Sequence, residues 1–300
     1  MVLQMLIMPA KSITHEHLLS VLHTEIHVRC VSDSIVRLLD AGCGDGELII
    51  YLRKNLPLLN KSLNFEIYGF DVCNHGVQKE GFLSKTIANL ENQIPGTPWR
   101  ERISLISEGE KWCYPDEFFN VIISNQVLEH VNDHELFFSE IYRTLQRDGF
   151  SAHLFPLKHY IYEGHLLLPL VHRIKNYPIL FSYIKCLSLL GLGKFKAHKK
   201  STGITVDIFT ERHADYMHYF TNYITYKDAL WLAKRYKMRI SFKYTHEFYT
   251  KKILSMLSLR SGYEYKKKRS SFIDWILFMI LRYISSVTLF LEKRETYTQR

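Results

Sequence analysis

The segment LLDAGCGDGELIIYL, residues 38–52, constrains the fold more than any other part of the chain. An apolar run is followed by three glycines in five positions, Gly42, Gly44 and Gly46, and then by a second apolar run. Glycine costs backbone entropy, so this cluster indicates a turn that a ligand approaches too closely to leave room for side chains. The pattern predicts a buried strand, a ligand-binding turn and a helix.

Apolar strands alternate with helices over about the first 150 residues, which predicts an open α/β sheet. Strands are expected at SIVRLLDAG, NFEIYGFDV, RISLISEG, FFNVIISNQ and FSAHLFPL, and helices at residues 13–31, 46–56 and 134–149. Later in the chain, Thr225 is expected to cap a helix, and a strand is expected from about Met238. We predict a Rossmann-like, seven-stranded, mostly parallel sheet with helices on both faces and a helical cap insertion.

Residues 158–224 interrupt the alternation, because they are aromatic and rich in histidine and lysine. Within them, LGLGKFKAHKKSTG is expected to be an exposed loop. We predict that residues 1–157 and 225–300 form the core of the fold. Residues 158–224 would then form an inserted cap over the sheet edge, where open α/β sheets bind ligands.

The composition is that of a folded domain, with 47% hydrophobic and 14% aromatic residues. Five scattered cysteines form no C-x-x-C pair, which argues against a zinc site or a disulfide framework and fits a reducing cytosol. The start, MVLQMLIMPAKS, lacks a charged region before its apolar stretch, so we do not expect a signal peptide. These features predict a cytoplasmic protein.

Charge is divided unevenly along the chain. Residues 1–150 carry 13 basic and 20 acidic side chains, whereas residues 151–300 carry 26 and 10, a net −7 against +16. The basic half indicates an anionic partner, which includes a phosphorylated substrate, a membrane surface or nucleic acid, unless its lysines are ordinary solvated residues. Nucleic acid ranks lower, because no RNA-binding module or arginine-rich stretch is visible.

The second expected strand ends in Asp71, about 30 residues after the glycine turn. An acid there can accept hydrogen bonds from both hydroxyls of a ribose, which predicts a nucleoside-containing ligand. The spacing G-x-G-x-G differs from the dinucleotide fingerprint, and Asp40 and Asp45 place negative charge at the turn. Acids repel pyrophosphate but suit the sulfonium and α-amino groups of S-adenosylmethionine.

Four segments, LLDAGCGDG, YGFDV, SEGEKWCYPDEFFNVIISNQVLEHV and EIYRTLQRDG, resemble in order and spacing the motifs of class I S-adenosylmethionine-dependent methyltransferases. The closest likeness is to bacterial small-molecule and ubiquinone-biosynthesis methyltransferases. It covers roughly residues 33–157 and is weak to absent over 158–300, where acceptor specificity would lie. The resemblance implies S-adenosylmethionine as cofactor and S-adenosylhomocysteine as product.

For the glycine turn, the resemblance implies contacts with the amino acid end of the cofactor. Asp40 would hold the turn and face that end. Gly42, Cys43 and Gly44 would line the methionine moiety, and Gly46 would complete the turn.

For the next two strand ends, the resemblance implies contacts with the nucleoside. Asp71 would bind the ribose, and Val72 would pack on the adenine. Glu108 stands where the family usually has Asp, and its carboxylate would accept from the adenine amino group, with help from the backbone of Gly109.

At the tip of the fourth strand, Asn125 and Gln126 would lie beside the reacting methyl group. Glu129 and His130, in VLEHV, follow directly. We interpret His130 as a residue that braces the loop at the start of a helix rather than as a catalytic group.

Methyl transfer is an in-line displacement that depends on alignment and desolvation, and it needs a general base only where the nucleophile must lose a proton. No metal is required, and we expect none. Base candidates gather just after the fifth strand: His153, His159, Tyr160, Tyr162, Glu163, His165 and His172. We predict His165 as the base and Glu163 as its orienter, because a turn can bring two such side chains into one pocket; His153 is expected to be a sheet residue.

The segment SFIDWILFMILRYISSVTLFLEKR, residues 271–294, allows several interpretations. A membrane span is opposed by Asp274 and Arg282, so it ranks last. We favour a helix to about Tyr283 that packs on the core, followed by SVTLFLEK as the final edge strand of the sheet. The alternative is docking of this helix on the inner membrane surface, aided by the basic run 266–269 before it.

The sequence thus predicts an S-adenosylmethionine-dependent methyltransferase that acts on a hydroxyl of a glycan, lipid-linked or other biosynthetic intermediate. One alternative is an RNA-directed methyltransferase that uses the basic half. Another is a catalytically silent S-adenosylmethionine-binding protein, against which the intact glycine turn and its acids argue.

Overall fold

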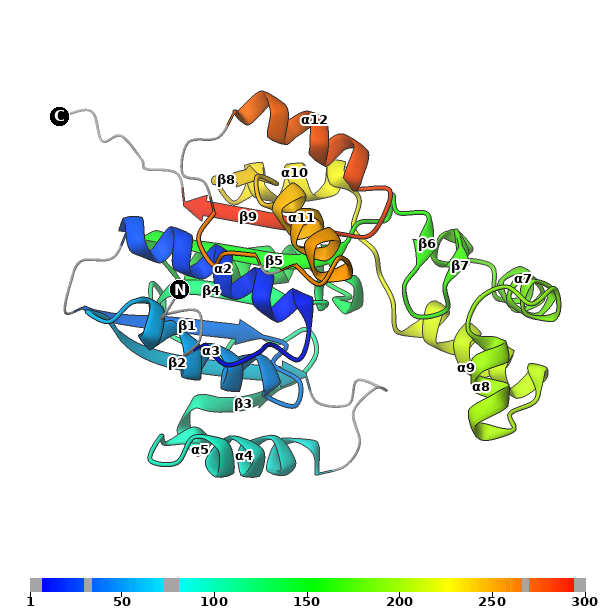
Figure 1. The fold of residues 1–300 in the computed structure, drawn as a ribbon, viewed down its shortest axis with the longest axis horizontal. Coiled ribbons are helices and arrows are strands. Elements are labelled where there is room, and N and C mark those ends of the chain that lie inside the picture. The colour runs from blue at the N-terminus through cyan, green and yellow to red at the C-terminus, as the bar shows by residue number, and fades with distance from the viewer. Residues whose placement is uncertain (1–6, 30–33, 73–80, 260, 266–269, 294–300) are drawn as a thin grey trace.

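The computed structural model describes residues 7–29, 34–72, 81–259, 261–265 and 270–293. A seven-stranded sheet with the order β3-β2-β1-β4-β5-β9-β8 forms its centre (Figure 1). The strands of this sheet are β1 (Ile35–Ala41), β2 (Asn64–Val72), β3 (Ile103–Ile106), β4 (Phe119–Asn125), β5 (Leu145–Pro156), β8 (Met238–Ser241) and β9 (Ser286–Lys293). The helices around it are α2 (Ile13–Arg29), α3 (Glu47–Leu59), α4 (Phe82–Gln93), α5 (Trp99–Arg102), η1 (Leu128–His130), α6 (His134–Thr144), α10 (Tyr226–Arg235), α11 (Thr245–Met256) and α12 (Ser271–Leu281).

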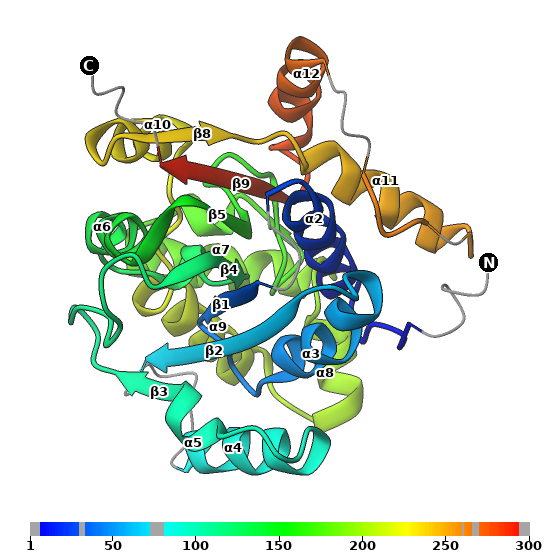
Figure 2. The ribbon, with the colours of Figure 1, turned by 90° about the vertical axis from the view of Figure 1, so that its left-hand side faces the viewer.

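Strands β1 to β5 pair in parallel, and β9 is antiparallel to both of its neighbours, β5 and β8. Helices α2, α3 and α11 cover one face of the sheet, and α6 and α10 cover the other (Figure 2). The predicted fold class is therefore confirmed. Central strand β4 is apolar because both of its faces are covered, as its fully buried Ile122 and Ile123 show.

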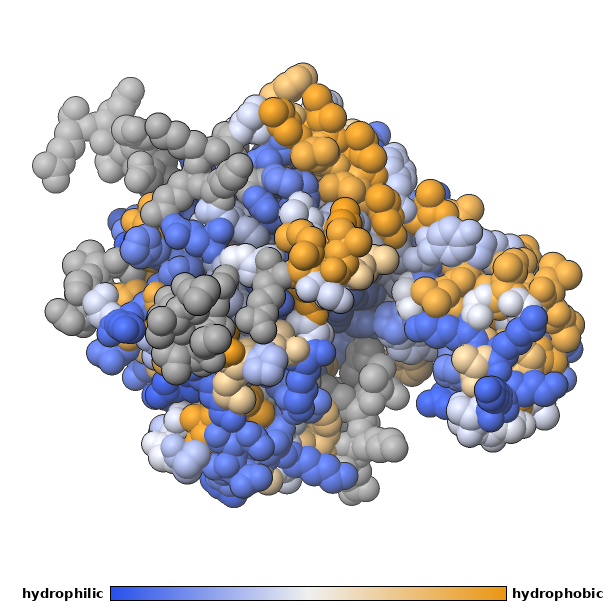
Figure 3. All heavy atoms as spheres, in the orientation of Figure 1, coloured by the Kyte–Doolittle hydropathy of each residue, from blue (hydrophilic) through white to orange (hydrophobic). Residues whose placement is uncertain are grey.

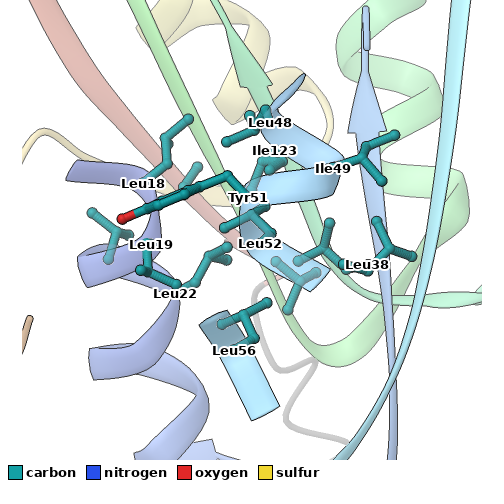
Figure 4. Close-up of a cluster of buried hydrophobic side chains, with 14 of the residues drawn as sticks. Leu18, Leu19, Leu22, Leu38, Leu48, Ile49, Tyr51, Leu52, Leu56 and Ile123 are labelled. Atoms are coloured by element: carbon teal, nitrogen blue, oxygen red, sulfur yellow. The ribbon is translucent and has the colours of Figure 1, made fainter. Parts of the chain in front are cut away.

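The core on the first face is built from the strand and helix that flank the glycine turn. Figure 4 shows leucines of α2 packed against Leu48, Leu52 and Leu56 of α3, with Leu38 of β1 on the side away from α2. These side chains are at most 4% exposed. This packing fixes the end of β1 relative to the start of α3, and so holds the turn between them in place.

Two sequence predictions at the fifth strand and the chain end were wrong in detail. Helix α6 ends at Thr144, and LQRDG already belongs to β5, where the Gly149 backbone packs against the Asn120 carbonyl. Strand β9 has the predicted position in the chain but is not the sheet edge, which is β8. The physical reason is that β8 pairs with the free edge of β9 at Met238↔Lys293 to Ser241↔Phe290, so that backbone hydrogen bonds join β9 to a strand on each side.

Residues 158–224 form a mainly helical unit with its own apolar cluster, at the right of Figure 1. It contains β6 (Tyr162–Glu163), β7 (Leu168–Pro169), η2 (Val171–Arg173), α7 (Tyr177–Leu189), α8 (Phe195–Thr202) and α9 (Val206–Tyr219). The predicted exposed loop is wrong in part, because α8 forms there and buries Phe195 against Phe209. The division of residues 158–224 from the core as a separate domain stays a prediction.

Helix α12 was expected to pack on the core, and for most of its length this is wrong. Among its described residues Phe278 is buried, whereas Phe272 and Ile273 are more than half exposed and Trp275 is 50% exposed. The basic run 266–269 lies outside the described residues. Within the part of the chain that the structure describes, every helix is too short or too polar to cross a bilayer.

Candidate functional site

The glycine turn is pinned to β2 and opens toward a cavity. The N–H groups of Gly42 and Cys43 both donate to the Phe70 carbonyl at 2.9 Å. Gly42 has φ +81°, and a Cβ there would lie 2.5 Å from Val127 Cγ2. Gly44 has φ +53° and nothing within 4 Å of the position its Cβ would take. Gly42 is therefore required by close packing, and Gly44 leaves its backbone facing open space.

A cavity of about 470 Å³ lies at the carboxyl ends of β1, β2 and β4. This volume is typical of small-molecule sites. Its lining includes eight of the eleven predicted cofactor residues: Gly42, Gly44, Asp71, Val72, Glu108, Gly109, Asn125 and Gln126. The sequence therefore located the cavity, although the contacts that these residues make with a ligand stay predictions.

The other three predicted residues are buried and are not among the residues that line the cavity. Asp40 is 1% exposed, and neither of its carboxyl oxygens has a hydrogen-bond partner among the described residues. Burial, followed by the negative charge of Asp71, raises its pKa well above the usual range. Cys43 is buried toward Gly69, and Gly46 starts α3 with its N–H donated to the Cys43 carbonyl at 3.0 Å.

Asp71 is held at the cavity by the backbone. Its carboxylate accepts from the N–H of Gly44 at 2.8 Å and from the N–H of Val72 at 2.7 Å. The hydrogen bond from Gly44 thus ties the glycine turn to Asp71, the residue that was predicted to bind ribose. Glu108, the other predicted acid, accepts from the side-chain amide of Asn132.

Asn125 and Gln126 differ in what their amides face. The Asn125 Oδ1 atom is buried and lacks a hydrogen-bond partner among the described residues, although the residue lines the cavity. The Gln126 amide instead donates to the Leu154 carbonyl and to Ser286 Oγ, at 3.1 and 3.0 Å. Asn125 is therefore the better placed of the two to meet a ligand.

The predicted base pair is brought together at the cavity rim. Glu163 is fully buried, and its Oε1 accepts from His165 Nδ1 at 2.6 Å, whereas the 44%-exposed His165 side chain lines the cavity. The Oε2 atom of Glu163 accepts from the Leu166 N–H at 2.7 Å. Burial acts to raise the pKa of Glu163, but the hydrogen bonds and charge of His165 outweigh it, so the net shift is downward.

Sequence reasoning missed Tyr216 altogether, and it assigned His130 a bracing role only. Tyr216, on α9, lines the cavity with its hydroxyl 3.1 Å from His165 Nε2. His130 does brace a loop, since its Nδ1 donates to the Phe220 carbonyl at 2.7 Å, but it also lines the cavity. Tyr216 carries no sequence signal, because it lies 51 residues from His165 on an ordinary amphipathic helix. His153 is a buried strand residue, as predicted.

The site is that of a nucleoside-binding α/β protein, with a glycine turn at β1 and an acid at the end of β2. A family model described as a methyltransferase domain matches residues 16–193, more than half of the chain. The chain therefore belongs to this methyltransferase family, and the predicted resemblance to class I S-adenosylmethionine-dependent methyltransferases is confirmed. It is an S-adenosylmethionine-dependent enzyme.

No curated protein matches the chain. Three of the similar solved structures are the YcgJ protein from Bacillus subtilis, a geranyl diphosphate C-methyltransferase from Streptomyces coelicolor and PKMT2 from Rickettsia typhi. Their identities are 14%, 9% and 11%, and their TM-scores are 0.44, 0.43 and 0.49. The matches cover 93%, 92% and 96% of this chain, and 99%, 80% and 54% of those chains.

The residues present suit this cofactor. Asn125 offers a buried acceptor without a partner among the described residues, and Gly44 leaves open space before the turn. Burial and the charge of Asp71 both oppose ionisation of Asp40. A sulfonium or ammonium group bound nearby would favour the ionised form of Asp40 and be attracted by it. When bound, S-adenosylmethionine supplies an electrophilic methyl group on a sulfonium.

We expect Asp71→Ala to weaken S-adenosylhomocysteine binding by about 1–3 kcal/mol, the scale of leaving buried polar groups unpaired. The loss should be large because the carboxylate also holds the Gly44 and Val72 N–H groups. Titration calorimetry measures the change, with the exposed Asp148→Ala as a control. Tight NADH binding without any response to S-adenosylhomocysteine would contradict this assignment.

Proposed function

We propose that the enzyme methylates a hydroxyl group of a glycan, lipid-linked or other biosynthetic intermediate, with His165 as general base and Glu163 as its orienter. The observation that carries the proposal is the short contact between Glu163 Oε1 and His165 Nδ1 at the cavity rim. A general base is useful where the nucleophile must lose a proton, as a hydroxyl must. The polar rim, which includes Asn125 and His130, also suits a hydroxylated acceptor.

The orienter works through the imidazole tautomer. An ionised Glu163 accepts from Nδ1, so Nδ1 carries the proton and the lone pair of His165 lies on Nε2. Tyr160 and Tyr223 each donate to the same carboxylate oxygen at 3.3 Å. These donors stabilise the buried charge and, with it, the orientation of His165.

Residues 158–224 would supply the acceptor side of the site. Their contribution to the cavity is His165 and Tyr216, whereas the glycine turn and Asp71 come from the core. The proposal therefore assigns cofactor binding to the core and acceptor choice to the insertion.

The reaction is tested by incubating the enzyme with methyl-labelled S-adenosylmethionine and pools of glycans, lipid-linked sugars and RNA. The proposal requires label in a glycan or lipid fraction, as an alkali-stable methyl ether on oxygen. Label confined to RNA, or a methyl group on nitrogen or carbon, would contradict it.

We also propose that the α12 face contacts an anionic membrane surface. Exposed apolar side chains of α12 gather with those of α11 in the space-filling view (Figure 3). They are Ile253 and Met256 of α11, Leu257 directly after it, and Phe272, Ile273, Trp275, Ile276 and Ile280 of α12. Contiguous exposed apolar side chains often mark a surface that contacts a protein or a membrane.

The choice of a membrane as the partner follows from charge and residue type. The half of the chain that contains α12 has a net charge of +16, and basic residues 266–269 directly precede the helix in the sequence. Basic residues beside an apolar helix favour anionic lipid, each adding about 1 kcal/mol near the surface. A half-exposed tryptophan such as Trp275 suits the interface between headgroups and acyl chains.

We expect binding to vesicles of phosphatidylcholine to rise when phosphatidylserine is added. It should fall between about 0.1 M and about 1 M salt, over which the screening length falls from about 10 Å to about 3 Å. Sedimentation measures the bound fraction. Trp275→Gln should reduce it, whereas Trp231→Gln, which changes another half-exposed tryptophan on α10, should not. Absence of vesicle binding would contradict the proposal, and so would salt-independent association that only detergent reverses.

A further inference from the structure

Two histidines face one tyrosine hydroxyl at the rim of the cavity. Tyr216 Oη lies 3.1 Å from His165 Nε2 and 3.3 Å from His130 Nε2. The three residues come from separate elements: η1 carries His130, the turn after β6 carries His165, and α9 carries Tyr216. All three line the cavity.

The second nitrogen of each imidazole is held by an acceptor. His130 Nδ1 lies 2.7 Å from the Phe220 carbonyl, which can only accept, so this nitrogen carries a proton. His165 Nδ1 lies 2.6 Å from the carboxylate of Glu163 and carries a proton for the same reason. In the neutral form of either ring, the lone pair is therefore on Nε2 and points at Tyr216.

A tyrosine hydroxyl has one proton, so Tyr216 can donate to only one of the two Nε2 atoms at a time. The other imidazole completes its contact with the oxygen only by donating, which requires a proton on its own Nε2. We call His130, Tyr216 and His165 together the bridge. All of its contacts are hydrogen bonds when the two imidazole rings together hold one additional proton. The arrangement favours uptake of one proton, and a second would place two cationic rings 5.9 Å apart.

We infer that His130, Tyr216 and His165 act as one proton-accepting unit, in which the Tyr216 hydroxyl lets the two imidazoles share a single proton. Tyr216 and His130 are then positioning residues that act through His165. This inference deepens the proposed function and, as far as catalysis is concerned, rests on it.

The groups around the bridge suit a single positive charge. Glu163 of β6 is ionised against His165, and Glu129 of η1 is a second buried carboxyl whose pKa burial raises to about 8. Glu129 is thus neutral near pH 7, so one carboxylate faces one shared proton. Other titratable groups that interact with Glu163 are Tyr160, Tyr223, His172 of η2 and His213 of α9.

In the proposed reaction, the acceptor oxygen bonds to the methyl carbon and the electron pair of the broken carbon–sulfur bond goes to sulfur. The hydroxyl proton of the acceptor passes to His165 Nε2, and Tyr216 then donates to His130 Nε2. The proton leaves the bridge to solvent after the methylated product has formed. The chain supplies every proton acceptor that this step needs.

The bridge is tested by nuclear magnetic resonance of imidazole nitrogens in the protein without cofactor or acceptor, from about pH 5 to about pH 9. We expect both neutral rings to carry their proton on Nδ1, and the first added proton to shift the signals of both rings together. In Tyr216→Phe, each ring should titrate alone. A proton on Nε2 in either neutral ring, or titrations that Tyr216→Phe leaves unchanged, would overturn the inference.

Kinetics provide a second measurement with matched variants. Tyr216→Phe and His130→Asn should each lower kcat by roughly 10- to 100-fold and shift its pH profile, with the KM for the cofactor unchanged. Asparagine keeps an N–H for the Phe220 carbonyl, so His130→Asn removes the Nε2 contact and preserves the brace. Tyr219→Phe, on the same helix and 61% exposed, is the control and should behave as the parent enzyme.

The two measurements separate the inference from the function on which it rests. If no hydroxyl acceptor is methylated, the proposed function fails, and the shared titration still decides whether the bridge exists. If methylation proceeds but both variants keep full kcat and the parent pH profile, the catalytic part of the inference is wrong.

Discussion

His165→Ala and Glu163→Gln are expected to lower kcat for a hydroxyl acceptor by about 10²- to 10⁴-fold, the usual contribution of a general base. His165→Ala removes the base itself. Glu163→Gln keeps the size of the buried side chain, but its amide group can present a donor to His165 Nδ1. The carboxylate accepts from both His165 Nδ1 and the Leu166 N–H, whereas glutamine has one acceptor oxygen for these two donors, so the tautomer of the ring is no longer fixed.

Binding of S-adenosylhomocysteine separates this effect from misfolding. Neither residue belongs to the glycine turn or to the Asp71 contacts, so both variants should bind the product as tightly as the parent. The control is His218→Ala, which changes an exposed histidine of α9 that is not a cavity residue. Full activity in both variants would show that His165 and Glu163 have only a structural role. It would also contradict a reaction that is assisted by a general base.

The sequence was informative where backbone conformation and burial restrict the choice of residue. The glycine turn, the apolar β4 and the acid at the end of β2 all lie where they were predicted. Their signals are local: Gly42 has no room for a Cβ, and Asp71 is the second-last residue of a strand whose limits match the predicted segment.

The sequence was less informative where long-range packing decides the structure. The place of β9 between β5 and β8 depends on strand pairing, which its own apolar residues cannot specify. The exposure of α12 was missed because its residues are apolar enough for a core helix. Tyr216 reaches the cavity through the folding of the insertion, so no motif near His165 could have pointed to it.

The pairing of Glu163 with His165 illustrates an intermediate case. Residue types and spacing suggested the pair, but two residues on a helix or a strand would have placed the side chains apart. The pair forms because β6 ends at Glu163 and a turn follows, stabilised by the Leu166 N–H on the same carboxylate. The residue types therefore predicted the pair, whereas the contact between the two side chains depends on the conformation of the turn.

Glu129→Gln is expected to make the stability of the protein less dependent on pH, with the largest gain at the alkaline end. Glu129 is fully buried, and neither carboxyl oxygen has a hydrogen-bond partner in the described part of the chain. Burial, reinforced by the charge of Glu163, raises its pKa from 4.5 to about 8. The folded protein thus keeps a proton that the unfolded chain releases above its own lower pKa.

The sign of the effect follows from proton linkage. Between the unfolded pKa and about pH 8 the folded state binds more protons at Glu129, so the free energy of unfolding falls as pH rises, by up to about 1.4 kcal/mol per pH unit. Below that range the Glu129 carboxyl is protonated in both the folded and the unfolded state, so it does not contribute to the pH dependence of the free energy of unfolding. Glutamine cannot ionise, so the difference between variant and parent should grow by a few kcal/mol across this window.

Urea unfolding of both proteins at several pH values between about 5 and 8 measures this difference. Exposed Glu211→Gln serves as the control, because removing a solvated carboxyl should leave the pH dependence of unfolding unchanged. Parallel stability curves for Glu129→Gln and the parent would show that Glu129 is ionised in the folded protein. In that case two carboxylates, Glu129 and Glu163, would face the bridge. Two negative charges would favour uptake of two protons by the bridge instead of one.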